Sequence, residues 1–228
     1  MSECRIHPDR PSPSPELLER LLALPTSVVS DSQQRAGGCS GLHAVASLQR
    51  GTVGGPALTV RTRPGDNLIV HQAMRLLCPG EVLVVDAGGA IDRAIVGEIM
   101  LRQLKAQGAA VVVVDGAVRD REGIAEQGLA VFARGVSHLG PYKNGPGEIR
   151  CEVQVGGTVV RDGDLVLADA DGVVVVAAER AAEVADIAEG RAAAEETLLA
   201  QASAGELDFA WVDESLTITW LDETEVEG

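Results

Sequence analysis

The chain has 228 residues, of which 46% are apolar and 2% aromatic, and its formal net charge is −15. This length suits one large domain, or one domain with an arm, and the apolar share excludes a wholly disordered chain. No basic tract interrupts the acidic charge, so nucleic acids and anionic membranes are poor partners. Because aromatic residues are scarce, small and branched side chains must fill the core, as they do in α/β sheets covered by helices.

Cysteine usage and the chain ends point to a soluble, cytoplasmic protein. The four cysteines lie far apart, with no C-x-x-C pair and no histidine at ligand spacing. A zinc site or a disulfide framework is therefore not expected. The N-terminus lacks an apolar signal segment, and no apolar run is long enough to cross a membrane.

In the first 90 residues the patterns predict a leader, two helices, a strand, a third helix and a second strand. Residues 1–15 contain four prolines and few apolar side chains, which favours a flexible leader. The helices are predicted at 15–24, just after residues 26–31 with an end at Gly37-Gly38, and at 67–77. The two strands are predicted at 51–61 and 81–86.

The segment 91–107 has two interpretations. One helix could begin at Asp92, or a short strand over 94–96 could precede a helix over 98–107. We favour the second, because Gly97 is tolerated as an N-cap and the acidic Glu98 suits a first helical turn. Gly108 would then end the helix.

Beyond residue 108 the chain alternates between strands, turns and helices. A buried strand over 109–114 is predicted to end in an Asp115-Gly116 turn, just before Arg119 and Asp120. The next elements are predicted as a helix at 122–127, a strand at 130–133 and a lid or contact loop at 140–147. Strands at 152–155, 158–160 and 164–168 follow, joined by hairpin turns at Gly156-Gly157 and Asp162-Gly163. The chain is then predicted to form a strand at 172–177, a helix at 179–204, and a strand through Leu216, Ile218 and Trp220.

Arg119 and Asp120 form the strongest candidate for a site. A guanidinium offers a fork for a carboxylate, and the adjacent carboxylate offers an oxygen to a hard cation. If a helix begins at Glu98, the free amides of Ile99 and Met100 would add an anion site at its N-terminus. Two plainer interpretations stay open: a solvated surface ion pair at 119–120, and a Glu98 that only complements the helix dipole.

Other motifs carry weaker signals. The Asp169-Ala-Asp171-Gly172 stretch lacks the remaining ligands of a calcium loop, and Gly88-Gly89 is not part of a nucleotide-binding fingerprint. The four histidines are scattered, and no G-x-S-x-G elbow indicates a hydrolase.

Taken together, several segments resemble the RraA-like family, which includes the class II pyruvate aldolases. The resemblance covers roughly residues 25–180 and rests on Asp31 with Gly37-Gly38, and on residues 54–60, 79–89, 94–98, 112–120, 131–134 and 163–173. It implies an α/β fold of the RraA-like type, a swivelling β/β/α or phosphohistidine-domain-like single domain with a C-terminal helical arm. We thus expect a leader at 1–15, a catalytic domain at 16–178, and a helix with an acidic tail for subunit contact at 179–228.

The resemblance also implies a reaction. Aldolases of this family, which act on 4-hydroxy-4-methyl-2-oxoglutarate and 4-carboxy-4-hydroxy-2-oxoadipate, release pyruvate from a 4-hydroxy-2-oxo acid with Mg²⁺ or Mn²⁺, and oxaloacetate decarboxylation is a natural companion activity. Their pattern of an acidic residue, twenty intervening residues and Arg-Asp matches Glu98, Arg119 and Asp120, although the acidic member is usually Asp. Asp120 would hold the metal, and Arg119 with residues 97, 99 and 100 (Gly97, Ile99 and Met100) would bind substrate.

The resemblance further implies homotrimers or homohexamers, in which a glutamate from a neighbouring C-terminal helix completes the site. Glu195 is the best match, with Glu196 beside it. An alternative function is that of a non-catalytic RraA-type regulator that binds ribonuclease E, but Asp120 argues against it. A third hypothesis, a methyltransferase, has no glycine-rich nucleoside loop to support it.

Overall fold

The computed structural model describes residues 1–46 and 51–219. The chain divides into two compact units, Met1–Arg191 and Ala192–Gly228, each of which is described by itself. Among the described residues, no helix has both the length and the apolar character needed to cross a membrane.

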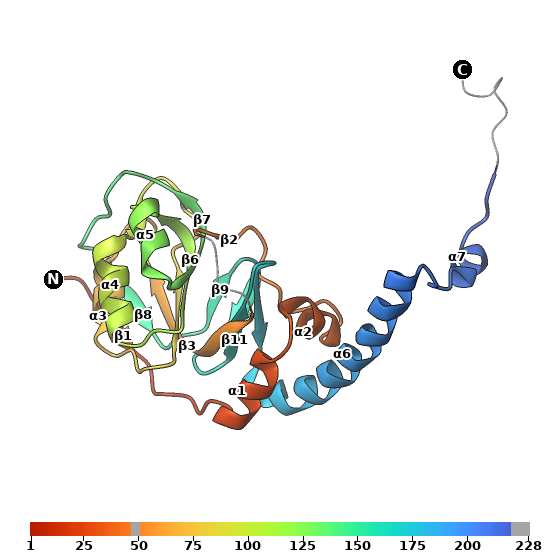
Figure 1. The fold of residues 1–228 in the computed structure, drawn as a ribbon. Helices are drawn as coiled ribbons and strands as arrows, with labels where there is room; N and C mark the ends of the chain where they lie inside the picture. Colours follow the sequence, from red (N-terminus) through yellow and green to blue (C-terminus); the bar gives the residue numbers. More distant parts are fainter. Residues whose placement is uncertain (47–50, 220–228) are drawn as a thin grey trace, which may run out of the picture. The chain divides into compact units, whose positions relative to one another are not determined.

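The first unit contains every strand of the described residues and most of their helices (Figure 1). The strands are β1 (Cys4–Ile6), β2 (His43–Ala44), β3 (Val53–Thr62), β4 (Val82–Asp86), β5 (Ala94–Val96), β6 (Val111–Val118), β7 (Ala130–Val136), β8 (Gly147–Ile149), β9 (Val153–Val155), β10 (Thr158–Val160), β11 (Leu165–Ala168) and β12 (Val173–Val176). The helices of the chain are α1 (Pro15–Leu22), α2 (Thr26–Ser32), α3 (Leu68–Met74), α4 (Glu98–Ala106), α5 (Arg121–Gln127), α6 (Ala181–Ala204) after a 3-10 turn at Ala178–Arg180, and α7 (Ala210–Ser215).

Four parallel neighbours, β3, β4, β6 and β7, form the centre of the main sheet. The path of this sheet is β1-β8-β3-β4-β6-β7-β2, with β5 alongside β6, and with β11 joining β3 to β12. Helices α3, α4 and α5 lie in the crossovers between the parallel strands. Such crossovers bring the carboxyl ends of the strands to one edge, where ligands bind in open α/β sheets.

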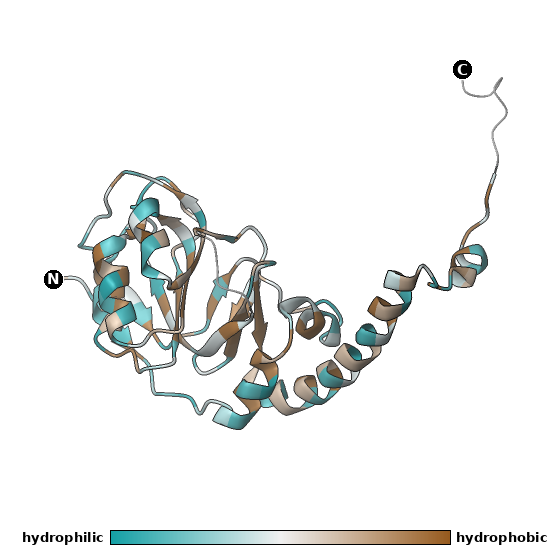
Figure 2. Cartoon of the chain, in the orientation of Figure 1, coloured by the Kyte–Doolittle hydropathy of each residue, from teal (hydrophilic) through white to brown (hydrophobic). Residues whose placement is uncertain are grey.

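Two apolar layers cover the two faces of the sheet. Alternation along β4 sends Leu83 and Val85 into the core shared with α3–α5, and Val82 and Val84 into the core shared with β9–β12. Figure 2 shows largely brown strands beside α3–α5, whose outer sides are teal. The result is a β/β/α arrangement, which confirms the predicted α/β class.

The structure selects between the two interpretations of residues 91–107. Strand β5 pairs in parallel with β6, and α4 begins at Glu98 with Gly97 as its N-cap. The second interpretation is therefore confirmed.

The predicted turn at Asp115-Gly116 is wrong, because β6 continues to Val118 with a register shift between Val114 and Ala117. Asp115 stays inside the strand because its carboxylate pairs with Arg134 and accepts the Gly156 N–H at 3.0 Å. A buried charge is tolerated when it is paired and hydrogen-bonded in this way. This continuation of β6 is what carries Arg119 and Asp120 to the edge of the sheet.

Three further predictions differ from the structure. The leader contains β1, which pairs in parallel with β8, so residues 4–6 are not a free segment. Asp162-Gly163 does not close a hairpin, because β10 pairs with β9 whereas β11 pairs with β3 and β12. The predicted strand in the tail is absent over residues 216–219, and its last member, Trp220, lies outside the described residues.

The described part of the second unit contains the C-terminal half of α6 and the whole of α7. None of its described residues is fully buried, and its large apolar side chains are exposed: Leu198, Leu199, Leu207, Phe209, Trp211, Leu216 and Ile218. Residues 192–228 contain ten acidic and no basic residues.

We expect Leu101→Ala to lower the free energy of unfolding by about 2–5 kcal/mol, because Leu101 lies fully buried between α4 and the sheet. The matched control is Leu139→Ala, the same change at a residue that is 44% exposed; its effect should stay below about 1 kcal/mol. Urea unfolding followed by circular dichroism measures both. Equal losses would contradict the assignment of the core.

Candidate active site

A pocket of about 130 Å³ opens at the carboxyl ends of the parallel strands. Its walls come from the segment after β3, from β5 and the start of α4, from the end of β6 and from the loop after β7. Its polar side chains are Asn67, His71, Arg119 and Lys143. The predicted substrate-binding residues Gly97, Ile99, Met100 and Arg119 all line this one pocket.

Asp120 holds the start of α4. Its Oδ2 atom accepts the Glu98 N–H at 3.1 Å and lies 3.4 Å from Arg119 Nε. The backbone of Asp120 is in the left-handed region, with φ of 64°, a conformation that non-glycine residues rarely adopt outside turns and functional sites. A carboxylate at a helix N-terminus is stabilised by the amide and by the helix dipole.

The Ile99 and Met100 amides lie in the first turn of α4. Neither N–H has a hydrogen-bond acceptor within the described ranges, whereas the Leu101 N–H bonds to Gly97 O. Asp120 takes only the first amide of the helix. Two N–H donors in the first turn of α4 therefore have no acceptor among the described residues, and donors at a helix N-terminus favour an anion.

Gly97 is the residue that lets Arg119 and Asp120 approach α4. A Cβ atom at position 97 would lie 2.6 Å from Asp120 Oδ2 and 2.9 Å from Arg119 Nε, closer than van der Waals contact allows. On its other side the Arg119 guanidinium runs past Gly140, where a Cβ atom would lie 3.3 Å from Nη1. The Arg119 side chain is 41% exposed, so it can reach a ligand in the pocket.

Glu98 lies beside this cluster but does not line the pocket. Its carboxylate accepts from Arg102 at 2.8 Å and 2.6 Å, and its second oxygen faces Gly123 on α5, where any Cβ atom would overlap it. The structure thus places Glu98 near Asp120 through its backbone, and turns its carboxylate towards α5.

Sequence reasoning missed the pocket residues Asn67 and His71, whereas Lys143 comes from the loop at 140–147 that was predicted as a lid or contact loop. Asn67 donates to Ile95 O at 2.9 Å, and its buried Oδ1 atom has no partner among the described residues. His71 and Lys143 complete the polar wall; burial, and then the positive charge of Lys143, hold the pKa of His71 below its ordinary value. Asn67 and His71 lie on the crossover after β3 and Lys143 lies on the loop after β7, and the position of these two segments was the only available signal.

Glu195 and Glu196 belong to the second unit, and their contribution to the site stays a prediction. No group of three His, Cys, Asp or Glu side chains in the described part of the chain could hold a metal ion. The metal-binding role of Asp120 also stays a prediction; Asp120 lies beside Arg119, which lines the pocket, and is not itself a lining residue.

A model of the RraA-like, or aldolase/RraA, family matches residues 26–175. The chain belongs to the RraA-like family. It is 37% identical to a protein of Halalkalibacterium halodurans named "Putative 4-hydroxy-4-methyl-2-oxoglutarate aldolase", over 71% of this chain and 76% of that protein. The family match ends before α6, so the arm and tail lie outside it.

Solved structures of RraA-family proteins share the fold. The RraAS2 protein of Streptomyces coelicolor, described as an unusual member of the RNase ES inhibitor RraA family, superposes with a TM-score of 0.75 at 29% identity, covering 82% of this chain and 98% of that one. An uncharacterized protein from Pseudomonas syringae gives a TM-score of 0.75 at 25% identity, over 87% and 97% of the two chains.

We expect Lys143→Met to raise the pKa of His71 towards its ordinary value, because the substitution removes a like charge while burial remains. NMR titration of the histidine ring signals measures this shift. Lys105→Met is the matched control, since Lys105 bonds to Gln127 O and does not line the pocket. An unchanged His71 titration in Lys143→Met would contradict the placement of the two side chains.

Proposed function

We propose that the protein is a divalent-metal-dependent aldolase that cleaves a 4-hydroxy-2-oxo acid to pyruvate and a second carbonyl compound. The observation that carries the proposal is the joint placement of the Arg119 guanidinium and the Asp120 carboxylate at the first amide of α4. A guanidinium fork binds a carboxylate, and a carboxylate oxygen binds a hard cation. The aldolase names of relatives support the same chemistry.

The donor set fits Mg²⁺ or Mn²⁺ held chiefly by waters and substrate. Asp120 Oδ2 is engaged by the Glu98 N–H, whereas Oδ1 has no hydrogen bond to the described residues. Mg²⁺ commonly binds through one or two carboxylates and keeps several waters. When bound, such an ion would polarise the 2-oxo group and stabilise the charge that develops on it.

The protein's own groups suit the organic part of the substrate. The carboxylate of the oxo acid would lie between the Arg119 guanidinium and the free amides of Ile99 and Met100, all of which line the pocket. Breaking the C3–C4 bond leaves its electron pair on the three-carbon fragment as pyruvate enolate, and Arg119 stabilises this charge. A proton must leave the 4-hydroxyl group, and a proton must reach C3 to complete pyruvate.

Glu195 of a second copy is our proposed base, acting through a water molecule. The Glu98 carboxylate, the other candidate, is held by Arg102 and faces α5 rather than the pocket. We therefore propose a homotrimer or homohexamer in which the α6 arm of one copy reaches the pocket of the next. Decarboxylation of oxaloacetate would use the same enolate stabilisation and is proposed as a side activity.

Pyruvate release from a panel of 4-hydroxy-2-oxo acids and oxaloacetate, with and without EDTA, tests the reaction. We expect Asp120→Asn to lower metal-dependent kcat by at least about 100-fold, since the negative charge that would bind the metal is lost. The control is Asp171→Asn, which changes an exposed aspartate away from the pocket. Full activity of Asp120→Asn at added Mg²⁺ would refute the role of Asp120.

Complementation tests the proposed contribution of Glu195. We expect Asp120→Asn and Glu195→Gln to be inactive alone and to regain activity when the two are unfolded, mixed and refolded together. Mixed oligomers would contain some pockets with both native residues, which requires that the residues come from different chains. The control is Glu206→Gln, which removes a different carboxylate from the same acidic arm and should stay active without mixing. Mixtures that stay inactive would contradict a shared site.

The regulator function is a second candidate because RraA proteins are structural neighbours. A chain that turns over no oxo acid but binds ribonuclease E in a pull-down would favour it.

A further inference from the structure

The loop after β7, residues 139–147, carries the pocket residues Pro141 and Lys143. Its length and composition predict a lid or contact loop, but the structure ties it to the segment after β3. The Tyr142 N–H donates to Gly65 O at 2.8 Å, and the Asn67 N–H donates to Tyr142 O at 3.1 Å. These two bonds form a parallel bridge that fixes the main chain beside Lys143.

Asp66 lies under this loop and is completely buried. Its Oδ2 atom accepts the Asn144 N–H at 2.9 Å, the Gly145 N–H at 2.7 Å and Arg63 Nη2 at 3.0 Å. Its Oδ1 atom accepts the Leu68 N–H at 2.9 Å, at the start of α3. One carboxylate thus joins the loop after β7 to the segment that carries Asn67 and His71.

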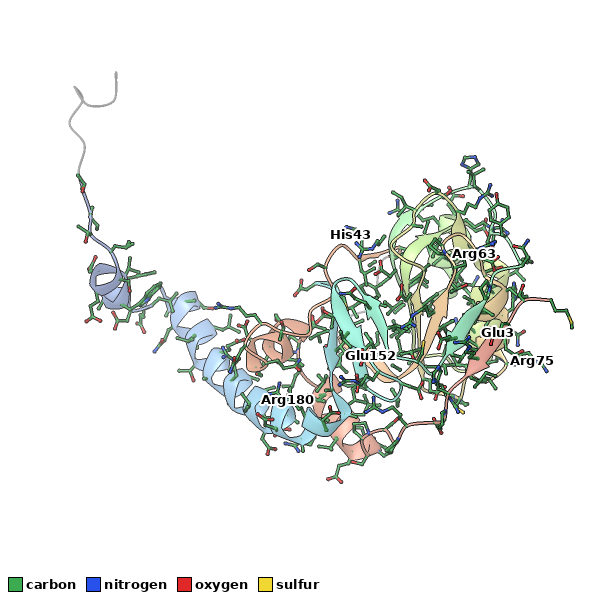
Figure 3. The ribbon with its side chains drawn as sticks, turned by 180° about the vertical axis from the view of Figure 1, so that it is seen from behind. Glu3, His43, Arg63, Arg75, Glu152 and Arg180 are labelled. Atoms are coloured by element: carbon green, nitrogen blue, oxygen red, sulfur yellow. The ribbon has the colours of Figure 1, made fainter. Side chains whose placement is uncertain are left out.

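The ring of Tyr142 adds a second attachment. It lies near two guanidinium groups, with the Arg93 Cζ atom 4.3 Å and the Arg63 Cζ atom 5.6 Å from the ring centroid. Arg93 also donates to Gly140 O at 2.8 Å, and Arg63, labelled in Figure 3, donates to Asn144 Oδ1 at 2.7 Å. Cation–π contacts of this kind hold an aromatic side chain in one orientation.

We propose that Asp66 is a positioning residue that holds Lys143 at the pocket for the anionic substrate. Asp66 does not line the pocket, so it acts through the loop and not through contact with the ligand. A preformed loop spares the ordering cost of immobilising a long cationic side chain on binding. The inference rests on the proposed function for the identity of the ligand, but the attachment of the loop can be tested without turnover.

Asp66→Asn is the direct test. An asparagine has one acceptor oxygen, so its NH₂ group must face either the loop amides or the Leu68 N–H. We expect faster amide hydrogen exchange over residues 139–147, and a KM for oxaloacetate or a cleaved hydroxy-oxo acid raised about tenfold with a smaller change in kcat. The matched control is Asp162→Asn, a buried aspartate that accepts the Thr59 and Arg10 N–H groups away from the pocket.

A double-mutant cycle separates positioning from general stability. In a Lys143→Met background, Asp66→Asn should raise KM little further, because the group that it positions is gone. Full additivity, or unchanged exchange of the loop in Asp66→Asn, would overturn the proposal.

Tyr142 supplies a second pair of variants if Asp66→Asn does not fold. Tyr142→Leu should speed loop exchange and raise KM, whereas Tyr142→Phe keeps the ring and should do neither. Equal effects of the two would overturn the proposed attachment. A protein that turns over no oxo acid would refute the proposed function, while the exchange measurements would still decide how the loop is held.

Discussion

The candidate site depends on one interaction, the hydrogen bond from the Glu98 N–H to the Asp120 carboxylate. It forms only because Asp120 adopts a left-handed backbone at the end of β6 and because Gly97 has no side chain to obstruct it. A residue held in that region costs of order 1–3 kcal/mol, and the surrounding structure must supply it. The long, fully buried β6 does so, since it anchors the chain up to Val118. The strain places the guanidinium and the carboxylate side by side at one pocket wall.

Much of the fold could be predicted because its information is local. The apolar runs in β4, β6 and β12 indicate strands buried on both faces, and Gly97 with Glu98 marks a helix start. The Asp115-Gly116 pair misleads for a physical reason: its turn-forming residues are outweighed by an ion pair to Arg134, which lies on the next strand. Pairing partners distant in sequence, such as β1 with β8, leave no local signal at all.

The same distinction applies to the site. Arg119 and Asp120 could be predicted because they are adjacent and because one turn presents both. Asn67 and His71 reach the pocket from the crossover after β3 and Lys143 from the loop after β7, and their meeting depends on the order of strands in the sheet. Composition and spacing carry no record of that order. For Glu98 the residue could be predicted, but its direction could not, since the position of α5 determines where its carboxylate lies.

Glu98 and Gly123 show how a substitution at the site can be absorbed by its surroundings. The glutamate is one methylene longer than the aspartate usual in the aldolases that this chain resembles, and its carboxylate occupies the space that a side chain at position 123 would need. Arg102, one turn further along α4, balances its charge. The Glu98 carboxylate is consequently not part of the pocket wall, which includes Gly97, Ile99, Met100 and Arg119. For the anionic substrate that we propose, the pairing with Arg102 would reduce repulsion by Glu98. The side chain at 98 is therefore directed away from the wall, while the backbone amide of the same residue still holds Asp120.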